Sequence, residues 1–290
     1  MIVDPLPVAW RFDAIGTSWR VDTRHPLPPA VADAVTARVE RFDRDWSRFR
    51  DDSLVAEIAR TPGRYRLPAD APPLLAHYRE LFDATAGRVS PLVGSALAAL
   101  GYDAAYRLRP TAHIPAVPAW DDAIAWDGEY LEVVRPVVLD IGAAGKGYLV
   151  DLVSDLLTDA GIPEHIVDGS GDLRTRGVPM RIALEHPLDP AKAVGIAELT
   201  DGAFCASATT RRAWGDGLHH VLDAATGLPT RGVIATWVLA PTALLADGLA
   251  TALFLDPDPE FVARSATAFA RMRVDGSLEV SPGFPGEVFA

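Results

Sequence analysis

Asp247 and Thr251 are the two side chains whose types and spacing most directly suggest metal chemistry. They lie four residues apart in the otherwise apolar segment 246–254, so on a helix they share one face. A carboxylate and a hydroxyl are costly to bury unless both are satisfied, and hard cations such as Mg²⁺ take oxygen ligands of this kind. The structural alternative is that Thr251 bonds back to the carbonyl four residues earlier and Asp247 is capped nearby. The pair alone leaves both interpretations open.

Two glycine-rich segments could approach a phosphorylated ligand. Residues 139–148 read LDIGAAGKGY and lead into a helix, whose N-terminal amides together with Lys146 would attract an anion. The segment is neither a Walker A loop nor a G-x-G-x-x-G fingerprint. Residues 167–174 read VDGSGDLR, with two glycines between Asp168 and Asp172. A tight strand-to-helix turn and a hairpin are the structural alternatives for the two segments.

Two adjacent histidines enter a turn with the sequence HHVLDAATGLP at residues 219–229. Turn chemistry accounts for Asp223 and Gly227 but not for the histidines. A histidine pair that binds metal from a helix is normally spaced i, i+4, which is absent. Strand neighbours point to opposite faces, so we expect only one of the two to face a ligand.

The elements that must position these residues are helices and strands without a regular βαβ rhythm. Apolar residues at helical spacing predict a helix after Pro28, with Val31 to Trp46 as its stripe, and further helices over residues 73–86, 147–160 and 243–255. Strands are predicted at residues 14–22 (broken by Gly16), 130–134, 137–139, 166–167, 181–184, 220–222 and 234–239, and a loop at 108–126. This mixture predicts an α+β fold with mixed or antiparallel sheets in a single domain.

The composition excludes several classes of protein. The net charge of -12 and the pI of about 5.0 argue against nucleic-acid binding, which needs clustered Lys and Arg. The single cysteine, Cys205, can form neither an internal disulfide nor a cysteine metal cage. No basic, apolar leader begins the sequence and no apolar run reaches about 20 residues. We therefore expect a cytoplasmic protein with no membrane anchor.

Taken together, the four segments resemble the FAD:protein FMN transferase (ApbE-type) family in order and spacing. Residues 140–151 are similar to the family's D-[LI]-G-G-[IV]-A-K-G-[YF]-x-[VA]-D, and 167–172 to its V-D-x-G-G-D turn. Residues 220–229 resemble H-[HI]-[IL]-[IL]-D-P-x-T-G-x-P, and 246–253 resemble A-D-[AG]-[LI]-[AS]-T-[AT]-[LF]. The pair Gly16–Thr17 resembles the family's M-G-T start. Ser170 and Ala224 replace a glycine and a proline of these patterns.

The resemblance implies a two-lobed fold spanning residues 1–290, with FAD bound as substrate in a shared cleft and Mg²⁺ at its pyrophosphate. Carried over by position, the metal ligands are the Gly145 carbonyl and the side chains of Asp247 and Thr251. His220 is implied at the flavin site, where it assists proton transfer, and His220 and Asp247 are the implied catalytic residues. The residues implied to bind FAD are Gly16, Thr17, Lys146, Asp172, Ser207 and His220.

The same resemblance implies the activity and the partner. The enzyme moves FMN from FAD to a Thr or Ser hydroxyl of an acceptor flavoprotein with an FMN-binding domain, and releases AMP. Two alternatives share the same residues: a magnesium-dependent FAD pyrophosphatase, with water as acceptor, and a non-catalytic FAD-binding protein.

Overall fold

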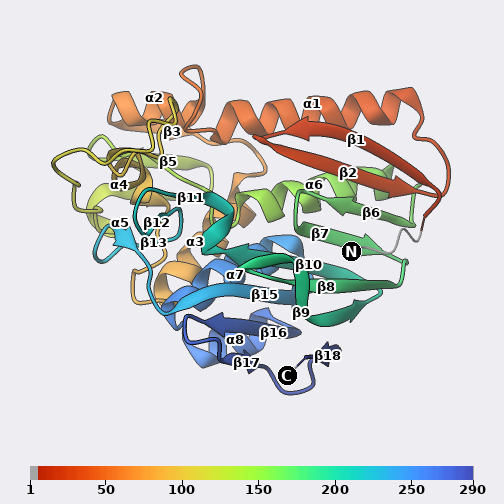
Figure 1. Ribbon diagram of the computed structural model, residues 1–290. Coiled ribbons are helices and arrows are strands. Elements are labelled where there is room, and N and C mark those ends of the chain that lie inside the picture. The colour runs from red at the N-terminus through yellow and green to blue at the C-terminus, as the bar shows by residue number, and fades with distance from the viewer. Residues whose placement is uncertain (1–5, 290) are drawn as a thin grey trace.

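The centre of the fold is an eight-stranded antiparallel sheet. In the computed structural model, which describes residues 6–289, its strands follow the order β1-β2-β6-β7-β10-β15-β16-β17. They are β1 (Val8–Ala14), β2 (Thr17–Thr23), β6 (His165–Asp168), β7 (Asp172–Arg176), β10 (Gly202–Ala208), β15 (Val233–Ala240), β16 (Ala268–Arg273) and β17 (Leu278–Val280). The N-terminal hairpin is joined to strands from the second half of the chain through β2 and β6 (Figure 1).

Smaller sheets flank this one. Three-stranded sheets are formed by β18 (Gly286–Val288), β9 (Asp189–Leu199) and β8 (Met180–His186), and by β3 (Gly63–Arg66), β5 (Tyr130–Val133) and β4 (Ile124–Trp126). Two-stranded pairs join β11 (Ala213–Trp214) to β12 (Leu218–His219), and β13 (Leu222–Asp223) to β14 (Leu228–Pro229). All strand pairs among the described residues are antiparallel, within the range that the sequence predicted.

The four helices predicted from apolar periodicity are all present. They are α1 (Pro29–Trp46), α3 (Ala71–Ala84), α6 (Gly145–Asp159) and α7 (Ala243–Ala252), the last continued by a 3₁₀ turn over Leu253–Leu255. Thr242 caps α7, because its hydroxyl accepts a hydrogen bond from the Leu245 amide. Short helices add α2 (Leu54–Arg60), α4 (Gly94–Ala99), α5 (Trp120–Ala123) and α8 (Pro259–Ser265).

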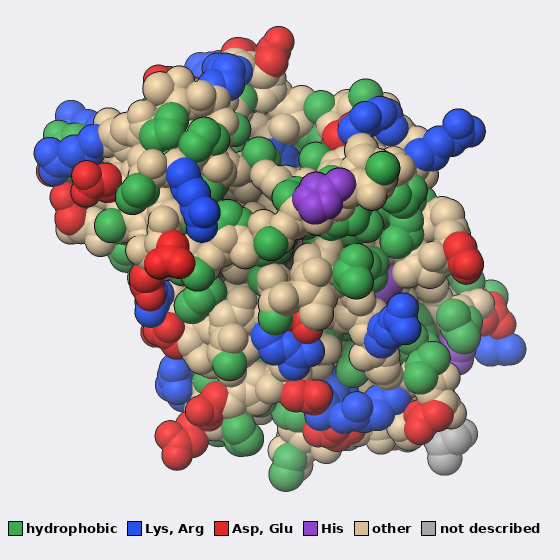
Figure 2. All heavy atoms as spheres, turned by 90° about the vertical axis from the view of Figure 1, so that its left-hand side faces the viewer, with side chains coloured by type: hydrophobic (Ala, Val, Ile, Leu, Met, Phe, Trp, Pro, Cys, Tyr) green, Lys and Arg blue, Asp and Glu red, His purple; other side chains and the backbone are tan. Residues whose placement is uncertain are grey.

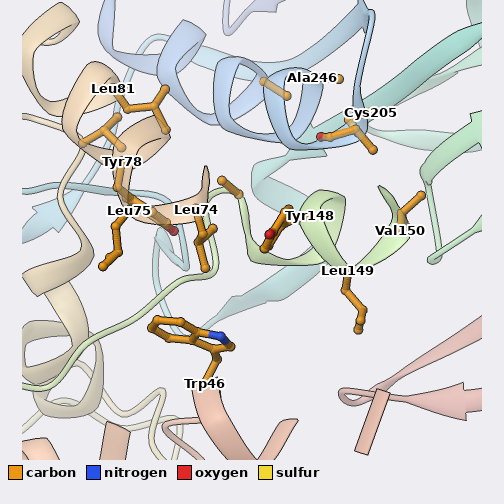
Figure 3. Close-up of a cluster of buried hydrophobic side chains, with 14 of the residues drawn as sticks. Trp46, Leu74, Leu75, Tyr78, Leu81, Tyr148, Leu149, Val150, Cys205 and Ala246 are labelled. Carbon is orange, nitrogen blue, oxygen red and sulfur yellow. The ribbon is translucent and has the colours of Figure 1, made fainter. Parts of the chain in front are cut away.

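The sheet separates two hydrophobic cores. On one face, Trp46 of α1, Tyr78 of α3, Leu149 of α6, Cys205 of β10 and Ala246 of α7 belong to one buried cluster (Figure 3). On the other face, apolar side chains of the large sheet pack against the β8–β9 hairpin. Because strand neighbours point to opposite faces, one sheet serves both cores and holds α6 and α7 rigidly on one side.

The predicted break at Gly16 is present: β1 ends at Ala14 and β2 begins at Thr17, with a tight turn at Ile15 and Gly16, where φ is 45° and 75°. Two other local predictions were wrong. Residues 220–222 do not form one strand, because the chain breaks between β12 and β13. The buried residues Val137 and Leu139 lie in irregular chain, so their apolar character reflects core contact and not strand pairing.

The predicted loop at residues 108–126 is only partly a loop. Its last part forms α5 and β4, with Trp120, Ala123 and Ile124 buried. The alanine and aspartate content hid a short amphipathic segment whose tryptophan packs against Phe82.

The surface carries charged side chains of both signs, as the composition with 27 Lys and Arg and 39 Asp and Glu residues predicts. On one face, positive and negative side chains are interspersed (Figure 2). Within residues 6–289, none of the helices combines the length and apolar character that crossing a membrane requires.

Candidate active site

One cavity of about 830 Å³ collects the residues to which the sequence gave chemical roles. All nine line it: Gly16, Thr17, Gly145, Lys146, Asp172, Ser207, His220, Asp247 and Thr251. They come from β2, β7, β10, α6, α7 and the intervening turns, and so from both halves of the chain. The volume lies within the range typical of cofactor-sized sites.

The oxygen-rich end of the cavity is built by two helices. Asp247 of α7 is 4% exposed, and its Oδ2 accepts a hydrogen bond from the Gly147 amide of α6 at 2.9 Å. The Thr251 hydroxyl donates to the carbonyl of Ala143, at 3.3 Å, on the loop that leads into α6. Thr251 therefore bonds across to the glycine-rich loop, and not to its own helix as the structural alternative required.

Gly147 allows this close helix contact. A Cβ at this position would lie 2.1 Å from the Ala243 carbonyl oxygen and 2.6 Å from the Asp247 Cβ. Backbone atoms cannot move aside as a flexible side chain can, so a larger residue would separate α6 from α7. The glycine of the G-K-G sequence is thus explained by packing between the two helices that carry the candidate ligands.

The charges at this end of the cavity do not balance. Burial, followed by repulsion from Asp172, raises the pKa of Asp247 well above its ordinary value, while Lys146 opposes the shift. The Lys146 Nζ lies 2.9 Å from Asp172 Oδ2 and donates to the carbonyl of Ser170 at 3.2 Å. Lys146 is thus paired directly with Asp172, and the Asp247 carboxylate has no direct ion-pair partner among the described residues, although the more distant positive charge of Arg212 also opposes the rise of its pKa.

The donors at this end fit a magnesium ion. Mg²⁺ prefers oxygen ligands and usually keeps one or two carboxylates while it shares substrate phosphates and water. Asp247 and Thr251 supply a carboxylate and a hydroxyl, and a cation would compensate the charge of Asp247. Among residues 6–289 there is no group of three or more His, Cys, Asp or Glu side chains placed to hold a metal ion.

The second glycine-rich segment is a hairpin turn that also borders the cavity. It joins β6 to β7, and the Gly171 amide donates to Asp168 Oδ1 at 2.9 Å. Ser170 adopts φ 63°, a left-handed conformation that glycine adopts most easily. The predicted hairpin is therefore confirmed, and the turn presents Ser170, Gly171 and Asp172 to the cavity, while contact with a ligand stays a prediction.

Only one of the two adjacent histidines lines the cavity. The His219 Nε2 pairs with the carbonyl oxygen of Thr230 at 3.1 Å, away from the cavity lining. His220 lines it, and burial, followed by the positive charge of Arg212, lowers the pKa of His220 to about 4. At neutral pH its imidazole is uncharged and can accept a proton.

Gly16, Thr17 and Ser207 border the cavity from the large sheet. Gly16 is in the β1–β2 turn, and the Thr17 hydroxyl donates to the Ala14 carbonyl at 3.2 Å and accepts from the Trp19 indole at 3.1 Å. Ser207 pairs with Thr236 in the β10–β15 ladder. Rigid strands and a fixed turn therefore hold these three residues.

An aromatic wall that the sequence analysis missed lines another part of the cavity. Tyr102 stacks on Trp214 with ring centroids 5.5 Å apart, and Phe49 stacks on Tyr106 at 5.6 Å. The Arg212 Nη1 donates to the Tyr102 hydroxyl at 2.7 Å. Arg212 forms no ion pair with a carboxylate among the described residues. The adjacent arginines Arg211 and Arg212, unusual in an acidic chain, were the sequence feature that could have pointed to this part of the cavity.

Comparison with known proteins identifies relatives of this arrangement. The model of the ApbE family matches residues 15–270. A FAD:protein FMN transferase from Rhodobacter capsulatus is 29% identical over 97% of this chain and 58% of its own length. One from Salmonella typhimurium is 26% identical over 83% of this chain and 76% of its own length. The chain thus spans less than two thirds of the first of these relatives.

Solved structures share the fold. The flavin transferase ApbE from Vibrio cholerae superposes with a TM-score of 0.80 at 22% identity, covering 96% of this chain and 97% of the other. The ApbE protein of Thermotoga maritima gives a TM-score of 0.79 at 24% identity, covering 95% and 97%. At these identities the similarity establishes the architecture.

Proposed function

Because the chain belongs to the ApbE family, we propose that it is a magnesium-dependent FAD:protein FMN transferase. It moves FMN from FAD to a Thr or Ser hydroxyl of an acceptor flavoprotein with an FMN-binding domain, and it releases AMP. Relatives at 29% and 26% identity carry the name FAD:protein FMN transferase, which supports this activity. The cytoplasmic location and the division into two lobes stay predictions from the sequence.

The observation that carries the proposal is the incompletely compensated carboxylate pair at one end of a cavity large enough for a dinucleotide. Asp247 and Asp172 are buried there, and Lys146 is paired directly with Asp172. A divalent cation would offset that excess charge and leave positive charge to attract a pyrophosphate. Gly145, Asp247 and Thr251 would hold Mg²⁺, which when bound neutralises pyrophosphate charge and stabilises the leaving AMP.

The remaining groups bind FAD and move the proton. In the reaction the acceptor hydroxyl oxygen forms a bond to the phosphorus next to FMN, and the bond from that phosphorus to AMP breaks. The neutral imidazole of His220 takes the hydroxyl proton, which its lowered pKa permits at neutral pH. Lys146 attracts the pyrophosphate with its positive charge, while the Gly145 and Gly147 amides at the start of α6 are already hydrogen-bonded to Ile141 and Asp247. Gly16, Thr17, Asp172 and Ser207 contact the rest of FAD.

The test is to incubate the protein with FAD and Mg²⁺, with and without an FMN-binding acceptor domain, and to quantify AMP, free FMN and covalent flavin. AMP formed together with covalent flavin, only when acceptor and Mg²⁺ are both present, supports the transferase. AMP and free FMN formed without acceptor would assign a pyrophosphatase instead. FAD that binds but is never cleaved would assign a binding protein.

A further inference from the structure

One buried carboxylate outside the cavity joins the two helices that carry the candidate metal ligands. Asp151 of α6 is 7% exposed. Its Oδ1 accepts a hydrogen bond from the Ala243 amide at 3.0 Å, and its Oδ2 accepts one from the Leu244 amide at 2.8 Å. These are the first two amides of α7, which have no partner within their own helix. A side chain of α6 therefore caps the N-terminus of α7.

The local cap of α7 does not perform this task. The Thr242 hydroxyl accepts only from the Leu245 amide, at 3.3 Å. The negative charge of Asp151 is compensated by Arg174 of β7, which forms an ion pair with its Oδ1. Asp151 thereby connects α6, α7 and the central sheet at one point.

Each helix accepts hydrogen bonds from the other. The carboxylate of Asp151 on α6 accepts hydrogen bonds from two amides of α7, and the carboxylate of Asp247 on α7 accepts one from the Gly147 amide of α6. Asp247 lies one helical turn beyond Ala243, which Asp151 holds. A shift of the capped turn therefore moves Asp247 and Thr251 relative to the beginning of α6, where Gly145 lies.

We propose that Asp151 is a positioning residue for the metal site, and that its carboxylate fixes the spacing between Gly145 on α6 and the Asp247–Thr251 pair on α7. The inference rests on the proposed function, because it takes these three residues as the Mg²⁺ ligands. Asp151 does not line the cavity in which FAD and the metal ion would bind. Its effect passes through the backbone of α7.

The chain offers a matched control. Asp155 lies one turn along α6 from Asp151, and it pairs with Arg176 of β7 at 2.8 Å. This second pair has the same residue types on the same two elements, two strand positions away from Arg174. Asp155 is exposed at the surface and hydrogen-bonds only to that arginine among the described residues. Asp155→Asn therefore removes a comparable charge without touching α7.

The experiment compares wild type, Asp151→Asn and Asp155→Asn by Mn²⁺ binding in the presence of FAD, followed by electron paramagnetic resonance. Loss of a residue that hydrogen-bonds a metal ligand typically weakens metal affinity about 10–100-fold. Asp151 acts one step further out, through the first turn of α7, so we expect Asp151→Asn to weaken Mn²⁺ affinity by about 10-fold, the lower end of that range. Asp155→Asn should bind Mn²⁺ as wild type does. In turnover, Asp151→Asn should raise the KM for Mg²⁺ while kcat at saturating Mg²⁺ recovers, a split that general loss of stability would not produce.

Circular dichroism establishes that each variant is folded, and Asp151→Glu provides a second variant. It keeps the charge opposite Arg174 but moves the carboxylate by one methylene, so its Mn²⁺ affinity should also fall. Folded Asp151 variants that bind Mn²⁺ like wild type would overturn the positioning role while leaving the proposed function intact. Wild-type protein that binds no Mn²⁺ would overturn the proposed metal site itself.

Discussion

The buried carboxylate of Asp247 destabilises the folded protein while it serves the proposed metal site. Its carboxylate is buried beside Asp172, and burial and this second carboxylate raise its pKa. The folded protein therefore binds a proton at Asp247 more readily than the unfolded chain does. Between the two pKa values, stability falls as pH rises, because the ionised form is the disfavoured one in the folded state.

The first prediction is that Asp247→Asn is more stable than wild type in EDTA at neutral pH, and inactive. The amide keeps an acceptor for the Gly147 amide but removes the buried charge. We expect a gain of about 1–2 kcal/mol, as is common when a strained functional site is relieved. Urea denaturation from pH 5 to 8 measures it, and the gain should shrink as pH falls. A variant less stable than wild type at every pH would contradict the charge argument.

The second prediction concerns His220. Its pKa of about 4 keeps the imidazole neutral across the usual assay range. Activity should therefore not fall near pH 6.5 through protonation of His220. Histidine-ring NMR, assigned with His220→Asn, should show His220 titrating near pH 4. His220→Asn should lower turnover about 10²–10⁴-fold, as expected for loss of a general base. Titration near the ordinary histidine pKa would refute the assignment of a buried, neutral base.

Most candidate site residues could be predicted from the sequence because they fall in short segments where small residues surround a polar one. Asp247, Thr251, Lys146 and His220 stand out in this way. Asp151 ends the pattern over residues 140–151, but its role could not be predicted, because its partners are backbone amides more than ninety positions away. Local sequence does not reveal contacts of that kind.

At the scale of elements, the site depends on the close approach of α6 and α7. Gly147 permits it, and the two carboxylates that cross between the helices fix it. The helices were predictable because their apolar faces repeat at helical spacing over many residues. Short strands such as β12 and β13 were not, because two-residue pairings depend on tertiary contacts more than on local pattern.

The third prediction is that Gly147→Ala destabilises the protein and weakens Mn²⁺ binding together. The added Cβ would meet the Ala243 carbonyl at 2.1 Å, so the helices must separate. Overpacking of this kind costs about 1–3 kcal/mol. Gly63→Ala is the control, since its Cβ would meet only the Tyr65 ring at 3.8 Å. Thermal unfolding and Mn²⁺ titration of both variants measure the effect. Unchanged Mn²⁺ binding in Gly147→Ala would show that the metal site does not depend on the spacing between α6 and α7.

At the scale of the whole molecule, the cavity draws on strands and helices from both halves of the chain. The α+β class with antiparallel sheets was predictable from the interleaving of short elements. The sheet order was not, because β2 pairs with β6 and β7 pairs with β10 across long stretches of sequence. The aromatic wall of the cavity was missed for the same reason, since Tyr102 and Trp214 meet only in the folded chain.

The fourth prediction is that FAD and Mg²⁺ stabilise the folded protein synergistically. Each ligand offsets part of the charge that disfavours the other: the cation balances the carboxylates, and the pyrophosphate adds ligands for the cation. A ligand at 100 times its Kd stabilises the folded state by about 2.7 kcal/mol. Thermal unfolding with FAD, Mg²⁺ or both should give a combined shift larger than the sum. Riboflavin, which lacks the pyrophosphate, is the control, and a purely additive shift with FAD would contradict a shared site.

The measurement that tests the central claim most directly is the mass of an acceptor domain after incubation with the protein, FAD and Mg²⁺. Wild-type protein should add one FMN to a single Thr or Ser of the acceptor, with one AMP released for each. Asp247→Asn, or an acceptor whose hydroxyl residue is replaced by valine, should give no adduct. If the mass of the acceptor is unchanged while FAD is cleaved to free FMN and AMP, the transferase activity is contradicted. The same cavity would then be the active site of a hydrolase.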